Sequence, residues 1–92
     1  MMLPAFDEHP QLGVLTTAAV LAGAPILMVS HDEDDGGWQF LCGTSNDPEQ
    51  GRIVHLADIV AIDPSVTAVA DLPVGWVAFR SAVTREWIRE PQ

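Results

Sequence analysis

The chain of 92 residues contains no lysine, no tyrosine and a single cysteine, Cys42. A P-loop needs its lysine to reach nucleotide phosphates, and pyridoxal or Schiff-base chemistry needs a lysine amine, so both classes are excluded. One cysteine excludes an internal disulfide and a multi-cysteine zinc site, and it fits a reducing compartment. All four basic residues are arginines, thirteen residues are acidic and the formal net charge is −9. Because nucleic-acid binding needs a basic face, we expect no nucleic-acid partner.

The sequence also lacks the patterns of a secretory signal and of a membrane span. Residues 1–11 contain Asp7 and Glu8 and no lysine or arginine, unlike the basic start of a signal peptide. The longest apolar stretch, residues 12–29, is interrupted by Gly23 and Pro25 and has no suitable flanking charges. We therefore expect a cytoplasmic protein with no membrane contact.

The charged residues are unevenly distributed. Residues 1–79 hold eleven acids and one arginine, whereas residues 80–92 hold three arginines and two glutamates. Four of the thirteen acids are consecutive, from Asp32 to Asp35. The pattern predicts an acidic body with one acidic loop and a slightly basic C-terminal end.

Short apolar segments separated by turn signals predict an α+β fold, a small single domain with a mainly antiparallel sheet and two or three short helices. The domain is expected to span residues 12–92, after an irregular lead-in over residues 1–11. Strands are expected over 12–15, 26–30, 38–42, 52–54 and 75–80, helices over 18–22 and 56–62, and a loop over 43–51. Asp63 and Pro64 predict the start of a third helix, with aspartate as its N-cap. In the helix before it, Leu56, Ile59 and Val60 are expected to face the core, with Ile62 as a further candidate.

Residues 81–90 fit two structures. A turn over 81–84 and a strand over 85–89 would complete a hairpin. A helix is the alternative, because Ala82, Val83, Trp87 and Ile88 also follow helical spacing. The preference of Thr, Trp and Ile for strands favours the hairpin.

The segment His31–Gly37 is predicted to be the tip of a hairpin, because acids and two glycines suit a turn. Its carboxylates are the ligand type of a hard cation, but the EF-hand pattern fails in both registers: the twelfth position would be Cys42 or Gly43 instead of glutamate. The remaining interpretations are a solvated turn and a protein-binding surface. The candidate partner-binding residues are Asp32, Glu33, Asp34, Asp35 and Trp38. We expect asparagine at 32, 34 or 35 to weaken binding without unfolding the domain.

Other catalytic or metal-binding patterns are missing from the sequence. The three histidines and Cys42 have no zinc-ligand spacing, and no G-x-S-x-G motif is present. Cys42 lies in an apolar predicted strand, which favours a buried structural cysteine. We therefore expect no cofactor, no metal and no enzymatic activity. A metal-binding or enzymatic domain centred on His31 remains the least favoured hypothesis.

The three tryptophans are numerous for so small a core. Two are expected to pack in the core and one to cover an edge. The three arginines after residue 79 are expected to stack on tryptophan rings or to pair with acids of the same chain. Contact of these residues with a partner is the alternative.

Three ordered motifs carry a resemblance to a known family. Residues 35–43 read D-G-x-W-x-F-x-x-G, residues 63–65 read D-P-S, and residues 72–80 read L-P-x-G-x-x-A-x-R, followed by Trp87. Over residues 12–89 the chain resembles a family of small bacterial domains that are similar to immunity-type proteins of polymorphic toxin systems. The resemblance implies an interaction domain and assigns no catalytic residue.

These observations together predict a non-catalytic protein-binding domain, of the immunity type, that binds a basic partner such as a toxin or a nuclease. A self-associating homodimer with a housekeeping or regulatory role is the alternative.

Overall fold

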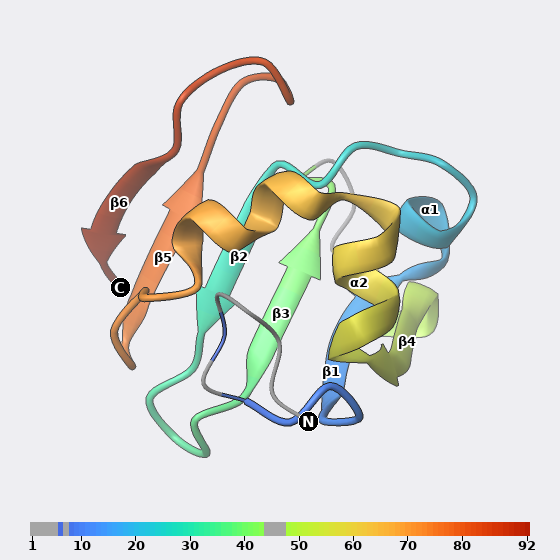
Figure 1. The fold of residues 1–92 in the computed structure, drawn as a ribbon, viewed down its shortest axis with the longest axis horizontal. Coiled ribbons are helices and arrows are strands. Elements are labelled where there is room, and N and C mark those ends of the chain that lie inside the picture. The colour runs from blue at the N-terminus through green and yellow to red at the C-terminus, as the bar shows by residue number, and fades with distance from the viewer. Residues whose placement is uncertain (1–5, 7, 44–47) are drawn as a thin grey trace.

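The computed structural model describes residues 6, 8–43 and 48–92, and in them six strands form one sheet in the order β4–β1–β3–β2–β5–β6 (Figure 1). The strands are β1 (Gly13–Thr17), β2 (Met28–His31), β3 (Trp38–Leu41), β4 (Gly51–His55), β5 (Trp76–Phe79) and β6 (Ile88–Pro91). β1 and β3 are parallel, and the other four neighbouring pairs are antiparallel. The predicted α+β class with a mainly antiparallel sheet is confirmed.

Short helices connect these strands. They are α1 (Ala18–Leu21), η1 (Pro48–Gln50), α2 (Leu56–Ile62) and η2 (Pro64–Val69), of which η1 and η2 are 3-10 helices. α1 begins where the Thr17 hydroxyl accepts a hydrogen bond from the Val20 amide at 3.3 Å. Of the predicted loop over 43–51, residues 44–47 lie outside the described residues, and the rest includes η1 and the first residue of β4.

The predicted helix start at Asp63 is confirmed, although the helix is 3-10 and not α. The Asp63 carboxylate accepts a hydrogen bond from the Ser65 amide at 3.0 Å, and Pro64 follows as the first helical residue. Ile62 is 46% exposed, so the prediction that it faces the core was wrong. The helix ends at this residue, and the chain then turns away to begin η2.

α2 and η2 make the two faces of the sheet unequal. The chain leaves β4 at one edge of the sheet and returns in β5 near the other edge, and the two helices cross one face on the way (Figure 1). Their buried side chains join a core with the inward side chains of the central strands. The core residues are Phe6, Val14, Val20, Ile26, Val29, Trp38, Phe40, Cys42, Leu56, Ile59, Val66, Val69, Leu72 and Ala78.

Phe6 shows that the predicted lead-in contributes to this core. Its ring is 2% exposed and packs edge-on against Trp38, with ring centroids 5.3 Å apart. The centroid of the Phe6 ring also lies 6.4 Å from that of Phe40. Residues 1–5 and 7 of the lead-in lie outside the described residues.

The hairpin predicted over residues 75–89 is confirmed, and the alternative helix over 81–90 is excluded. The second strand begins at Ile88, three residues later than the expected start at Arg85. The intervening loop contains a turn in which the Arg85 amide donates to the Ala82 carbonyl at 3.0 Å. Among the described residues, no helix has the length and apolar character needed to cross a bilayer.

Candidate functional site

The predicted acidic loop connects β2 to β3 and is closed by its own hydrogen bonds. The Asp32 amide donates to the Gly37 carbonyl at 2.7 Å, and the Gly36 amide donates to the Asp32 carbonyl at 3.0 Å. The Gly37 amide donates to the Asp35 carboxylate at 2.8 Å. Gly36 has a φ of +71°, a conformation that glycine adopts without strain. The acidic segment is therefore a defined turn with a fixed backbone path.

Asp32 differs from the other three acids because its carboxylate is bound to the sheet. One oxygen accepts a hydrogen bond from the Ser30 hydroxyl at 2.8 Å, and the other accepts one from the Gln39 side-chain amide at 2.6 Å. The side chain of Gln92, just beyond β6, donates to the same Ser30 hydroxyl at 3.1 Å. Asp32 therefore anchors the loop to strands β2 and β3.

Glu33, Asp34 and Asp35 are exposed, so their carboxylates face solvent. Beside them lies a hollow of about 290 Å³, lined by the four acids together with Gly75 and Gln92. Gly75, from the L-P-x-G motif, has a φ of +84°, and a Cβ atom on it would lie 3.7 Å from the Cβ atom of Glu33. The motif thus brings the start of β5 against the acidic loop.

Trp38, the fifth predicted contact residue, is 3% exposed and offers almost no surface to a partner. Its indole ring stacks on His31, with centroids 3.9 Å apart and an interplanar angle of 16°. His31 Nδ1 lies 2.7 Å from the Leu72 carbonyl oxygen, and this nitrogen carries the proton because a carbonyl oxygen only accepts. His31 and Trp38 therefore form a stacked pair at the base of the loop, where β2 ends and β3 begins.

The acids of the loop do not form a metal centre in the described part of the chain. No group of three or more His, Cys, Asp or Glu side chains there is placed to hold a metal ion. With three solvent-facing carboxylates beside a shallow hollow, the arrangement can attract the cationic side chains of another protein.

The D-P-S and A-x-R motifs meet at a second cluster, built around the buried Arg80 side chain. Its Nη2 atom lies 2.8 Å from the Asp63 carboxylate, and its Nη1 atom donates to the Ser65 hydroxyl at 2.9 Å. Two further bonds, at 3.1 and 3.0 Å, run to the Ile26 carbonyl. The guanidinium carbon lies 4.0 Å from the ring centroid of Trp87. With these contacts the guanidinium joins the end of β5 to η2 and to the segment before β2, and its role is structural.

The predicted pairing of the arginines with residues of the same chain is confirmed at Arg80 and Arg89. Arg89 donates to the Ala68 carbonyl at 2.7 Å, and its Nη1 atom lies 2.8 Å from the Asp71 carboxylate. Cys42 is buried, as predicted. Trp38 is the fully buried tryptophan, whereas Trp76 and Trp87 are half-buried and pack against the core.

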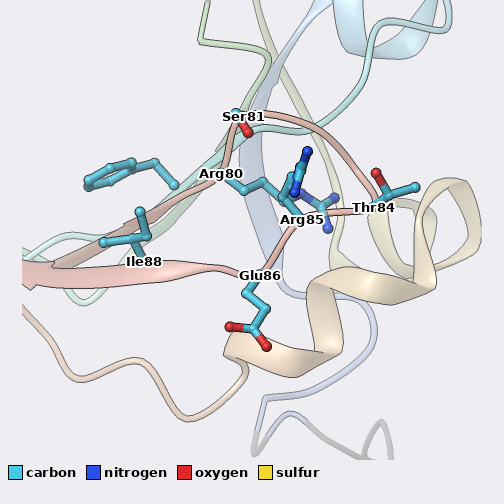
Figure 2. Close-up of a pocket in the computed structure, with 7 residues that line it drawn as sticks. Arg80, Ser81, Thr84, Arg85, Glu86 and Ile88 are labelled. Atoms are coloured by element: carbon cyan, nitrogen blue, oxygen red, sulfur yellow. The ribbon is translucent and has the colours of Figure 1, made fainter.

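A hollow of about 650 Å³ lies where β5 ends and β6 begins, beside the loop that connects them (Figure 2). Phe79 and Ile88 line it with the connecting loop, from which Figure 2 shows Ser81, Thr84, Arg85 and Glu86. Because Phe79 and Ile88 are partners across the hairpin, they provide an apolar wall. This hollow can take an apolar side chain.

Two features of the site were not predicted from the sequence. The link of Asp32 to Ser30 and Gln39 is one, because it depends on the pairing of β2 with β3. The other is the set of apolar residues on the face of the sheet opposite α2 and η2. The signal was present as apolar residues at both alternating positions of the predicted strands, as in Trp76, Val77, Ala78 and Phe79.

Comparisons of the chain with protein-family models, with curated proteins and with solved structures give no match. The function is therefore inferred from the geometry of the acidic loop and the sheet.

Proposed function

We propose that this chain is a non-catalytic, cytoplasmic protein-binding domain, and that it acts as a bacterial immunity-type protein by binding a basic toxin or nuclease. The observation that carries the proposal is the anchored acidic loop. Asp32 is bound to Ser30 and Gln39, while Glu33, Asp34 and Asp35 remain exposed beside it. A partner thus meets a loop whose backbone is fixed by Asp32 before it arrives, which limits the conformational entropy lost on binding.

The overall charge supports a basic partner. At a formal net charge of −9, the chain attracts cationic proteins over distances comparable to the Debye length, about 8 Å at physiological salt. Charge complementarity of this kind accelerates association and disfavours acidic partners. Acidic side chains facing a nuclease can also occupy the positions of its substrate phosphates. Inhibition by occlusion then requires no chemistry from this chain.

Self-association is the second candidate function, and the exposed apolar residues of the sheet favour it. Ile53 on the edge strand β4 is 71% exposed, and Ile88 on the opposite edge strand β6 is 57% exposed. Edge strands offer unpaired backbone groups to another strand. Light scattering of the purified chain separates a monomer from a homodimer. A tight homodimer would favour this alternative.

The test of the proposed function is binding to a toxin or nuclease encoded beside this gene, in an inactivated form, measured by titration calorimetry at low and high salt. We expect a complex at low salt whose affinity falls as the salt concentration rises. Replacing Asp34 with asparagine should weaken binding at low salt more than at high salt. Asp58→Asn is the matched control, because it removes one charge on α2 and retains an oxygen to accept the His55 amide. Absence of a complex at low salt would refute the proposal.

A further inference from the structure

The strands carry apolar residues on the side of the sheet that points away from α2 and η2. Directly paired residues share a face, so the strand pairing places Leu41, Met28, Phe79 and Ile88 in one row across four strands. A second row begins with Ile53 and Leu15 on the neighbouring strands. We call this surface the open sheet face; its apolar members are Leu15, Met28, Leu41, Ile53, Val77, Phe79 and Ile88.

These residues do not belong to the core. The buried cluster and the half-buried apolar residues packed against it include none of the seven members. Antiparallel sheets with one solvated face usually carry polar residues there. Because this face is apolar along a row of four strands, it has the character of an interaction surface.

The charges around the open sheet face are mainly of one sign. Asp32 lies on this side, because it binds Ser30 and Gln39, which occupy outward positions of β2 and β3. Glu90 also points outward, opposite Val77. Arg80 and Arg89 lie on the other side, where Asp63 and Asp71 bind them. At one end of the open sheet face, the hollow of Figure 2 is lined by Arg80 and Arg85 together with Glu86.

We infer that the open sheet face is the apolar centre of the interface with the basic partner, and that the acidic loop is one side of its margin. This inference rests on the proposed function and specifies the partner surface: an apolar patch bordered on one side by lysine or arginine side chains. The hollow between Phe79, Ile88 and the loop is the place for an apolar anchor residue of the partner. An apolar centre with a charged margin is the usual anatomy of a specific interface.

Charge argues against a second copy as the occupant. Two copies paired through this face would bring Asp32 and Glu90 of each chain, and two chains of net charge −9, into one interface. A basic partner instead neutralises the same carboxylates. The carboxylates on the open side therefore favour a basic protein as the occupant of this face.

The test compares isoleucines on the two sides of the sheet. Ile53→Gln and Ile88→Gln change exposed residues of the open sheet face, and Ile62→Gln makes the same change on α2. With the inactivated neighbouring toxin as the probe, each open-face variant should weaken binding about tenfold, mainly through faster dissociation. Ile62→Gln should change the affinity less than about twofold. Since all three residues are exposed, the variants should retain the thermal stability of the wild type.

Met28 supplies an independent readout on the same surface. The chain has three methionines, of which Met28 lies in strand β2. With methyl-labelled methionine, the Met28 NMR signal should shift or broaden when the toxin is added, and Met28→Leu identifies that signal. Light scattering of the toxin-free chain should give a monomer.

The outcomes separate this inference from the proposed function. If the toxin binds normally to Ile53→Gln and Ile88→Gln and leaves the Met28 signal unchanged, the inference is wrong while the proposed function stands. If the wild type binds no toxin, both are wrong. A homodimer that the two open-face variants dissociate, and Ile62→Gln does not, would overturn the inference by making a second copy the occupant.

Discussion

The guanidinium of Arg80 lies 2.8 Å from the carboxylate of Asp63, in an ion pair whose arginine side chain is only 2% exposed. Asp63 ends α2 and caps η2, while Arg80 follows β5 directly. The pair therefore links the junction of α2 and η2 to the end of β5. Two motifs that are separated in the sequence, D-P-S and A-x-R, thus have one structural explanation.

We predict that Arg80→Gln destabilises the domain by about 3–5 kcal/mol, the usual cost of removing one partner of a buried ion pair. The variant leaves the Asp63 carboxylate and the Ile26 carbonyl without their arginine donors. Urea unfolding measures the loss. The exposed Arg85→Gln, which removes the same charge in the adjacent loop, should change stability by less than about 0.5 kcal/mol. Equal effects of the two variants would contradict the structural role of Arg80.

We predict that the four acids of the loop differ in their effect on stability. Asp32 accepts hydrogen bonds at both oxygens, so Asp32→Asn turns an NH2 group toward one of two donors and should cost about 1–3 kcal/mol. Asp34→Asn changes an exposed residue and should be nearly neutral. Thermal or urea unfolding of both variants tests the difference. The sequence alone predicted that both substitutions would leave the fold intact, and a neutral Asp32→Asn would support that simpler expectation.

The helices, strands and turns were predicted from the sequence more accurately than the tertiary contacts between them. Turn and capping chemistry is local, so the acidic turn before Trp38 and the helix start at Asp63–Pro64 were both found. The start of β6 was misplaced because the Val83 carbonyl and the Trp87 ring, in the preceding loop, both contact Arg80. Such contacts depend on the tertiary structure, and the spacing of apolar residues does not reveal them.

In the candidate site too, the local feature was predicted from the sequence and the features that depend on the tertiary structure were not. The acids from Asp32 to Asp35 stood out as a run of like charge, and three of them are exposed as expected of a contact surface. Trp38 was included because it is an aromatic neighbour, but β3 turns its side chain into the core. The open sheet face was not recognised, because a strand with apolar residues on both sides looks like a buried strand until the position of the helices is known.

We predict that Phe6→Ala destabilises the domain by about 3–5 kcal/mol, although Phe6 lies outside every helix and strand. Its buried ring fills the space beside Trp38 and Phe40, and alanine would leave a cavity there. Urea unfolding, together with the tryptophan fluorescence spectrum, measures the effect. Phe6→Leu should recover about half of the lost stability, because it refills part of the volume. A neutral Phe6→Ala would show that the segment before β1 is dispensable for the core.

The pair Arg89 and Asp71 gives a prediction for pH. The hydrogen bond from Arg89 lowers the pKa of the Asp71 carboxyl below its ordinary value, and the positive charge acts in the same direction. Because the folded pKa is below the unfolded one, the pair stabilises the fold fully above the unfolded pKa of about 3.9. This stabilisation is lost as the pH falls through the folded pKa.

Arg89→Gln should therefore raise the pKa of Asp71 toward its ordinary value, as followed by the carbon NMR shift of the carboxyl group. The stability difference between wild type and variant should be present at neutral pH and should shrink as the solution is acidified below the unfolded pKa. It should also shrink with added salt, because Asp71 is largely exposed and the interaction is screened. An Asp71 pKa that is the same in both proteins would show that the 2.8 Å contact does not persist in solution.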